Sequence, residues 1–364
     1  MAKYLYLFLL MVGVLSSCQT MEQISIDYML PGEVSFPAQL RKVAVVNNVS
    51  DTPDRPLKPD ENKSKEENEI SRAVAYFPGN PAVATESLAK TIAEQNYFDE
   101  VIICDSALRA HDLTPRESTL SRREVNQLAR GLGADVLIAL ENLQIKATKA
   151  ISYIPEWNCH YGTVDAKVYP TVKVYLPSRN GPMVTINNND SIFWEEYGST
   201  EVNVRSYLPT DKQILSEASE FAGSLPVKYL LPYWKTSYRY VFVNGSVDMR
   251  DAAIYAKEKE WEKAFKLWER AYNTAKSDKK KMRAAFNITL YYEMNDQLEE
   301  AEKWATQAQA LAQKVDKVNM EDTLIDVSRI PNYYLATLYL NELKERTAGM
   351  AKLESQMSRF NDDF

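Results

Sequence analysis

The stretch GLGADVLIALENLQI, residues 131–145, passes through glycines into a run of aliphatic residues. A short apolar run that begins at a turn is typical of a buried β-strand. The stretch LRKVAVVNNVS, residues 40–50, has β-branched residues and ends in turn formers, which predicts a strand over about 42–47. These two stretches set the expected centre of a first domain.

The segment between these two stretches supplies two helices and a further strand. Asn80 is suited to cap a helix and Pro81 to occupy its first position, and Leu88 and Ile92 then share a face. EVIIC, residues 100–104, follows as a short buried strand. Ser121 and Glu124 form a capping box for a second helix. The apolar stripe of this helix is Val125, Leu128 and Leu132. Strand, helix, strand, helix and strand in this order predict an α/β layer.

The chain becomes rich in short β-type runs after Lys146. Residues 166–199 contain Asn-Gly at 180–181 and a polar run at 187–190, and both are hairpin-turn signals. A helix is expected next, with one apolar face made of Ile214, Ala218, Phe221 and Leu225. SYRYVFVN, residues 237–244, is expected to close the domain as a strand. The predicted fold class is therefore a mixed sheet with flanking helices, α+β or α/β.

A strongly charged stretch interrupts the first domain. Residues 51–72 contain 12 charged residues and three prolines, and such a stretch buries too little apolar area to offset the entropy of ordering. We therefore expect a mobile charged loop over residues 50–80.

The order VAVVNN, YFDEVIICD, GADVLIALE and VKVYLPSRNG resembles the envelope α/β domain of three groups of proteins: TolB N-terminal domains, CsgG-like curli-export proteins and penicillin-binding-protein-activator lipoproteins. The resemblance covers residues 40–243. It implies a non-enzymatic component of an envelope assembly, although a shared fold does not fix a function.

The last part of the chain contains an internal repeat. Ala252, Tyr255, Ala264 and Ala271 recur 37 positions later as Thr289, Tyr292, Ala301 and Ala308. Small residues at this spacing resemble the tetratricopeptide repeat, in which they let paired helices approach closely. The usual period is 34 residues, so the connection over 276–281 is expected to hold the three extra residues. Residues 330–357 are expected to form a capping helix pair.

The N-terminus has the features of a processed signal. Lys3 precedes an apolar run over 4–15, which is shorter than the roughly 20 residues of a membrane-spanning helix. Leu15, Ser16, Ser17 and Cys18 then resemble the lipobox of bacterial lipoproteins. This resemblance implies cleavage after residue 17 and acylation of Cys18. Gln19 replaces the aspartate of the usual inner-membrane retention signal, so we expect the outer membrane, and its periplasmic face rather than the cell surface.

Composition excludes some classes of function. Without residues 1–17 the chain has a net charge of −8, one lysine having been removed, and an acidic chain is a poor binder of phosphate backbones. We therefore expect no nucleic-acid partner. Only Cys104 and Cys159 remain besides Cys18. Their pairing is left open, and a buried structural thiol is the commoner role for a residue placed like Cys104.

We find no catalytic, metal-binding or cofactor-binding motif in the sequence. His111 and His160 lack ligand spacing, and Cys159 with His160 offers too few ligands for zinc. Glu195 and Glu196 are adjacent on a predicted strand and so point to opposite faces. Three tryptophans could form a sugar-binding platform, although core packing is the commoner role of aromatic residues. They are Trp157, Trp194 and Trp234.

The sequence thus predicts four segments: a signal peptide over 1–17, a tether over 18–37, an envelope α/β domain over 38–245 and tetratricopeptide-like helices over 246–364. The whole arrangement resembles a lipoprotein family of Bacteroidales. We expect a non-enzymatic lipoprotein without cofactors that binds an envelope protein. The alternative is a surface lipoprotein that binds glycans or nutrients, analogous to SusD-like proteins.

Overall fold

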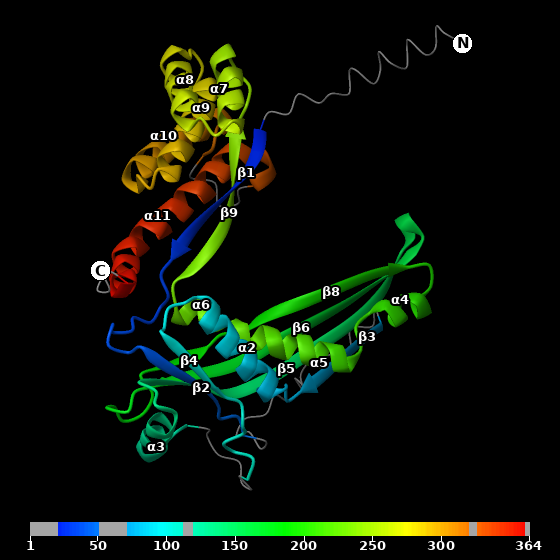
Figure 1. Ribbon diagram of the computed structural model, residues 1–364. Coiled ribbons are helices and arrows are strands. Elements are labelled where there is room, and N and C mark those ends of the chain that lie inside the picture. The colour runs from blue at the N-terminus through cyan, green and yellow to red at the C-terminus, as the bar shows by residue number, and fades with distance from the viewer. Residues whose placement is uncertain (1–20, 51–70, 112–118, 320–325, 361–364) are drawn as a thin grey trace. The chain divides into compact units, whose positions relative to one another are not determined.

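The computed structural model describes residues 21–50, 71–111, 119–319 and 326–360, and it divides the chain into two compact units (Figure 1). The helical unit contains the chain up to Leu30 and Trp234–Glu354. The sheet unit contains Pro31–Tyr233 and the chain from Ser355 onward. A mixed sheet and an all-helical C-terminal region are therefore both present, as the sequence predicts. The predicted signal peptide, Cys18 and most of the predicted charged loop lie outside the described residues.

Three parallel strands form one half of the sheet. Strand β2 (Lys42–Asn47) lies between β4 (Glu100–Cys104) and β5 (Val136–Ile154) and is parallel to both. Helices α2 (Pro81–Glu94) and α3 (Arg122–Leu132) pack on opposite faces of these strands. Val43 and Val45 of β2 share a core with α2, whereas the alternate residues Ala44 and Val46 share a second core with α3. The predicted order of strand, helix, strand, helix and strand is confirmed. The prediction that residues 100–104 are buried is wrong: every residue of β4 is exposed or partly exposed, Cys104 included, because β4 is an outer strand of the described sheet.

Local sequence signals set the ends of these helices. The Asn80 side chain accepts a hydrogen bond from the amide of Val83, and Ser121 and Glu124 form a reciprocal capping box. Gly133 ends α3 in a left-handed conformation with φ of 68°, which glycine adopts without steric cost. The predicted caps are confirmed.

Antiparallel strands form the other half of the sheet. Strand β5 continues to Ile154 and pairs along its length with β6 (Cys159–Tyr175). Strand β3 (Ser71–Phe77) pairs with β5 on the outer side, whereas β7 (Val184–Asn187) and β8 (Asp190–Gly198) pair with β6. The short β-type runs predicted after Lys146 are thus parts of longer strands.

Two predictions in this half of the sheet are wrong. Residues 187–190 do not form a hairpin, because β7 and β8 are both antiparallel to β6 and therefore run in the same direction. Asn188 and Asn189 only interrupt one long strand. Residues 71–77 are not part of a loop, because they form strand β3 and pair with β5. By contrast, Asn180 and Gly181 do lie in the connection between the paired strands β6 and β7.

Helices α4 (Glu201–Tyr207), α5 (Asp211–Ser224) and α6 (Val227–Leu230) complete the sheet unit. The predicted apolar face of α5 is buried at Ile214, Ala218 and Leu225, and Phe221 is partly buried against the same core. Helix α5 approaches α2 closely at Gly223. A Cβ at this glycine would lie 2.1 Å from the carbonyl oxygen of Ala84.

The C-terminal residues fold back into the sheet unit. The Gln356 side chain accepts a hydrogen bond from the Gly32 amide and donates to the carbonyl of Val34 at 2.8 Å. The Arg359 guanidinium lies over the ring of Tyr97, 4.3 Å from its centroid. Both contacts are buried, so residues 355–360 belong to the sheet unit.

The helical unit contains a two-stranded sheet, and its strands come from the predicted tether and from the predicted end of the first domain. Strand β1 (Met21–Leu30) lies within the predicted tether and pairs with β9 (Tyr233–Phe242). Strand β9 was expected to close the first domain. Instead its Val241 and Phe242 join the helical core, against which Ile24 of β1 also packs. Because the apolar side chains of β1 and β9 pack against the helical core, both strands are part of the helical unit.

Five helices follow in the described part of the chain, and the first four form two similar hairpins. The five are α7 (Val247–Lys257), α8 (Trp261–Thr274), α9 (Asp278–Met294), α10 (Leu298–Asp316) and α11 (Pro331–Met357). The α7–α8 turn has its left-handed residue at Lys259, and the α9–α10 turn has its own at Asp296, 37 positions later. The small repeat positions are buried at Ala252, Ala264, Ala271, Thr289, Ala301 and Ala308. Tyr255 and Tyr292 are partly buried against the same core.

Two details of the predicted repeat are wrong. Only residues 275–277 connect α8 to α9, and the extra length lies in α9, which has 17 residues against 11 in α7. The third segment is one helix of 27 residues and not a pair. Polar residues in its middle do not break it, because its sequence from Asn332 to Met357 contains no proline.

Candidate functional site

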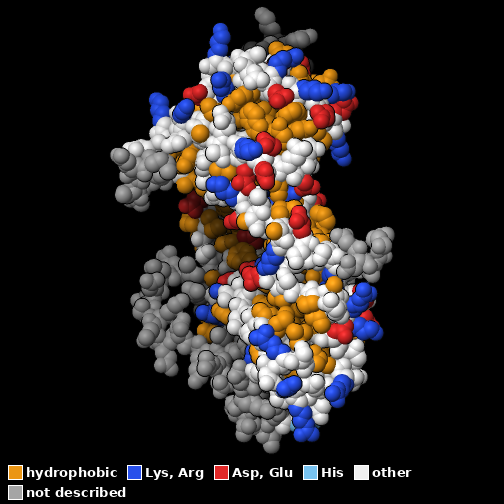
Figure 2. Space-filling view, turned by 90° about the vertical axis from the view of Figure 1, so that its left-hand side faces the viewer, with side chains coloured by type: hydrophobic (Ala, Val, Ile, Leu, Met, Phe, Trp, Pro, Cys, Tyr) orange, Lys and Arg blue, Asp and Glu red, His pale blue; other side chains and the backbone are white. Residues whose placement is uncertain are grey.

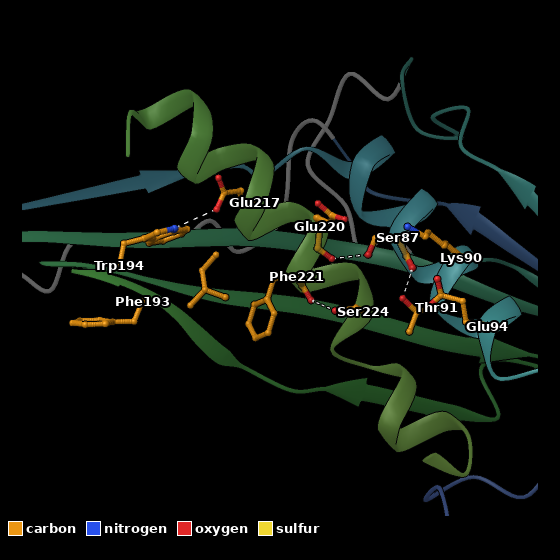
Figure 3. Close-up of a pocket in the computed structure, with 11 residues that line it drawn as sticks. Ser87, Lys90, Thr91, Glu94, Phe193, Trp194, Glu217, Glu220, Phe221 and Ser224 are labelled. Carbon is orange, nitrogen blue, oxygen red and sulfur yellow. Dashed lines mark hydrogen bonds between the residues drawn. The ribbon is translucent and has the colours of Figure 1, made fainter. Parts of the chain in front are cut away.

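A groove of about 510 Å³ opens on the sheet unit (Figure 3). Two helices and the outer strand β8 form its walls. Its lining is Ser87, Lys90, Thr91 and Glu94 of α2, Glu217, Glu220, Phe221 and Ser224 of α5, and Ile192, Phe193 and Trp194 of β8. In Figure 3 the α5 residues lie between Trp194 and Phe193 on one side and the α2 residues on the other.

The groove reaches the edge of β8. Successive residues of a strand point to opposite faces, so a hollow bordered by Ile192, Phe193 and Trp194 meets the strand at its edge and not on one face alone. Within the described ranges, β8 pairs with β6 and with no second strand. Its other edge therefore faces the groove.

Hydrogen bonds fix the walls of the groove. Trp194 Nε1 donates to Glu217 Oε2 at 3.2 Å and so connects β8 to α5. Ser87 Oγ donates to the carbonyl of Glu220 at 2.7 Å, and Thr91 Oγ1 donates to the carbonyl of Ser87 at 2.8 Å. The Ser87 hydroxyl holds α2 against α5, in line with the close approach at Gly223, whereas the Thr91 bond lies within α2.

Exposed groups give the groove a negative charge. Glu94, Glu217 and Glu220 are exposed at its rim and face one exposed amine, that of Lys90. Between them lie the indole of Trp194 and the ring of Phe221. The groove therefore offers apolar surface surrounded by carboxylates.

Aromatic side chains cluster at the far end of β8. The ring centroids of Trp157 and Tyr197 lie 6.1 Å apart, and those of Tyr161 and Tyr197 lie 4.8 Å apart. Trp157 is 65% exposed and Tyr197 is 47% exposed. A hydrogen bond from the Tyr161 hydroxyl to Glu195, with a length of 2.8 Å, raises the pKa of Tyr161 to about 12. We call Trp157, Tyr161 and Tyr197 the aromatic cluster.

A short turn presents Trp157. The turn Pro155–Trp157 connects β5 to β6, and Asn158 closes it in a left-handed conformation with φ of 48°. The Tyr153 hydroxyl donates to Asn158 Oδ1 at 2.7 Å. This bond ties the turn to β5 and holds the indole at the tip of the long hairpin.

A buried polar cluster lies where the parallel strands end. The Tyr175 hydroxyl donates to Glu141 Oε1, and Lys173 Nζ lies 2.8 Å from Glu141 Oε2. Asn48 donates to the same carboxylate at 3.2 Å and accepts from Arg109 Nε at 2.8 Å. Ligands of α/β folds often bind at this edge of the sheet. Here the groups are buried and bonded to one another, so we assign them to holding the strand ends together.

The helical unit contains a second buried cluster, which is ionic. Arg239 of β9 donates from Nε and Nη2 to the two carboxylate oxygens of Glu293, both at 2.8 Å. The Tyr339 hydroxyl donates to Glu293 Oε2 at 2.6 Å, and Arg346 Nη1 lies 3.4 Å from Glu293 Oε1. A bidentate guanidinium pair of this kind is among the stronger charged contacts in proteins.

Glu342 extends the ionic cluster to both strands of the helical unit. Its Oε2 accepts from Arg239 Nη1 at 2.7 Å. Its Oε1 accepts from Tyr28 of β1 at 2.7 Å and from Ser237 of β9 at 2.6 Å. Lys235 lies 2.7 Å from the same oxygen. The cluster therefore joins β1 and β9 to α9 and α11.

The structure separates the residues that the sequence singled out. Trp194 lines the groove, Trp157 lies at the other end of β8, and Trp234 belongs to the helical unit and is exposed. Cys104 and Cys159 are both free thiols. His160 packs against Tyr153, with ring centroids 5.1 Å apart.

The described residues contain no group of three or more acidic, histidine or cysteine side chains placed to hold a metal ion. Among them, no helix is long and apolar enough to cross a membrane.

Two family models match the chain. The model of the domain of unknown function DUF8603 matches residues 40–242, more than half of the chain. The chain belongs to the DUF8603 family. A second model, the domain of unknown function DUF6340, matches residues 250–345. The groove, the aromatic cluster and the cluster at Glu141 all fall within the DUF8603 match. No curated protein and no solved structure matches the chain.

Proposed function

We propose that this chain is a non-enzymatic lipoprotein, anchored through Cys18, that binds a protein partner in the assembly or maintenance of the cell envelope. The observation that carries the proposal is β8, an outer strand with an acidic groove at one end and an exposed aromatic cluster at the other. We place the anchor in the outer membrane, with the protein on the periplasmic face.

The chemistry of the β8 surface favours a protein partner. Tyrosine, tryptophan and phenylalanine are enriched in protein interfaces, and grouped exposed apolar side chains mark such sites more often than scattered ones do. Phe193 is 55% exposed and adds to the apolar surface of β8 between the groove and the aromatic cluster.

The helices provide a second binding surface in this proposal. The two hairpins of the helical unit share their turn geometry and small packing residues, which supports a tetratricopeptide-like repeat, and such repeats commonly bind proteins. Figure 2 shows hydrophobic side chains gathered between charged ones on the face of the helical unit that it draws.

Cross-linking in cells tests the partner. A photoreactive amino acid replaces Phe193 or Trp157 in the full chain, and a matched control carries it at Val202 of α4, which is also exposed. We expect one envelope protein to be cross-linked from positions 193 and 157 but not from 202. Cross-links of equal yield from all three positions, or from none, would contradict a partner at β8.

The anchor has a separate test. Cys18→Ala is expected to abolish labelling with a radioactive fatty acid and to leave the unprocessed precursor. Ser17→Ala keeps a small residue at the cleavage site and serves as the control, with normal labelling. Normal maturation of the Cys18→Ala variant would refute the anchor.

A glycan-binding surface lipoprotein is the second candidate. The exposed Trp157 beside Tyr197 favours it, because sugars pack on aromatic faces near carboxylates such as Glu195. Protease treatment of intact cells separates the two candidates. Digestion of the chain would favour the surface receptor, and protection would favour the periplasmic partner.

A further inference from the structure

Strand β8 has the properties of a strand that accepts another strand. It extends over nine residues, Asp190–Gly198, and in the described part of the chain its ladder joins it to β6 alone. The outer edge of a strand carries a row of backbone donors and acceptors that another chain can pair with. Extended peptides bind many domains in this way, with side-chain pockets supplying specificity.

The groove supplies such pockets beside the edge. An extended peptide turns alternate side chains to one face, and on the helical face it would meet Ile192, Trp194 and Phe221. The hydrogen bond from Trp194 to Glu217 fixes the indole at this wall. The aliphatic stems of basic side chains in the added strand would therefore find apolar contacts there, with their charged ends near the carboxylates of the rim.

Charge favours a basic strand. β8 carries Asp190, Glu195 and Glu196 and has no lysine or arginine. The exposed rim of the groove adds three carboxylates against Lys90 alone. Opposite charges on neighbouring strands stabilise their pairing, whereas like charges weaken it.

Strand β3, another outer strand of the sheet, provides a contrast. It pairs with β5, and the hollow near it measures about 110 Å³. The charged side chains lining that hollow are Lys149 and Arg205. A basic strand is therefore not expected to prefer β3.

We propose that the partner contributes an extended segment of alternating apolar and basic residues that pairs with the outer edge of β8. This inference rests on the proposed function and specifies the chemistry of the partner at that site. The basic residues lie on the helical face, where they meet Glu217, Glu220 and Glu196, and the apolar ones lie on the opposite face, beside the exposed Phe193 and Tyr197.

Labelled peptides and the detergent-solubilised full chain test this inference. The probes are a capped octapeptide of alternating lysine and valine, the same peptide with glutamate for lysine, and the lysine peptide with one central proline. Fluorescence anisotropy is expected to show binding of the lysine peptide, and at least ten-fold weaker binding of the other two. Similar affinity for the lysine and glutamate peptides would overturn the inference.

Substitutions in the groove test whether the lysine peptide binds there. Glu217→Gln together with Glu220→Gln is expected to weaken the lysine peptide about ten-fold. The control Glu86→Gln removes an exposed carboxylate of α2 that does not line the groove, and no change is expected. Equal loss in both variants would indicate attraction to the acidic chain as a whole and overturn the site.

Hydrogen exchange distinguishes strand pairing from side-chain docking. Added pairing is expected to slow the exchange of β8 amides when the lysine peptide is bound, while β3 amides are unchanged. Unchanged β8 amides would overturn strand addition. If the photoreactive residue at position 193 still cross-links a partner in cells, the proposed function stands and only strand addition fails. Binding of the lysine peptide with no partner cross-linked in cells would instead contradict the proposed function.

Discussion

A buried carboxylate of the sheet unit and a partly buried carboxylate of the helical unit differ in the number of cations beside them. In the sheet unit, Glu141 has one ammonium beside it, that of Lys173. In the helical unit, Glu342 accepts from Arg239 and from Lys235. Burial disfavours the charged form in both places, so the number of cations and donors decides the outcome.

The pKa values of the two carboxyls diverge for this reason. Burial raises the pKa of Glu141, and the bonds from Lys173 and Tyr175 oppose it only in part. Burial also acts to raise the pKa of Glu342, but bonds from Lys235, Ser237 and Tyr28 outweigh it and lower the value to about 2. The comparison shows that the cations and hydroxyls around Glu342 keep it ionised, whereas the neighbours of Glu141 do not offset its burial.

The largest predicted effect comes from breaking the ionic cluster. Glu293→Gln removes the anion that pairs with two buried guanidinium groups, Arg239 and Arg346. Removing one partner of a buried pair costs about 3–5 kcal/mol, which we expect as a loss of unfolding free energy in urea. The control Glu262→Gln removes the partner of Tyr291 at the surface and should cost less than about 1 kcal/mol. Equal losses would contradict the special position of Glu293.

Acid is expected to weaken the helical unit first. For Glu342 the folded pKa of about 2 lies below the ordinary 4.5, so its stabilising effect is present above pH 4.5 and is lost as the pH falls towards 2. The difference corresponds to about 3 kcal/mol. For Glu141 the pKa is raised, so protonation does not remove stability there. Unfolding free energies measured between pH 5 and 2 should fall in the native chain and fall less in Glu342→Gln.

A smaller effect is expected where the sheet unit depends on close packing. Gly223→Ala would place a Cβ 2.1 Å from the Ala84 carbonyl oxygen and 2.8 Å from Ser87 Cβ, forcing α5 away from α2. We expect a loss of about 1–3 kcal/mol in thermal unfolding. Gly131→Ala in α3 meets no atom within 4 Å and should stabilise by about 0.5–1 kcal/mol. The same sign for both changes would contradict the packing argument.

The smallest effect on stability is expected at the aromatic cluster. Trp157 is largely exposed, so Trp157→Ala should change the unfolding free energy by less than about 0.5 kcal/mol. Its effect should appear in the yield of cross-linked partner from position 193. A matched change, Tyr207→Ala on the exposed surface of α4, should leave that yield unchanged.

Local patterns predicted the parts of the fold that depend on neighbouring residues. The caps at Asn80 and Ser121 and the parallel strands could be identified because each signal lies within a few residues. The place of β1 could not, because its partner β9 is about 200 residues away and the choice depends on burial against the helices. The continuation of β5 past Lys146 was also missed, since its small and polar residues carry little apolar signal.

The candidate site could be predicted only in part. The tryptophans were visible in the sequence, but the groove needs α2, α5 and β8, which come together only in the folded sheet. The ionic cluster at Glu293 left no sequence signal, because Arg239, Glu293 and Glu342 lie on three separate elements.

The first residue of β1 determines how far the protein can move from its proposed anchor. Three peptide units separate Cys18 from Met21, and a fully extended chain spans about 10 Å over that distance. A free tether ending at residue 37 would reach roughly 65 Å. A lipid at Cys18 would thus hold the start of β1 within about 10 Å of the acylated residue, close to the lipid headgroups.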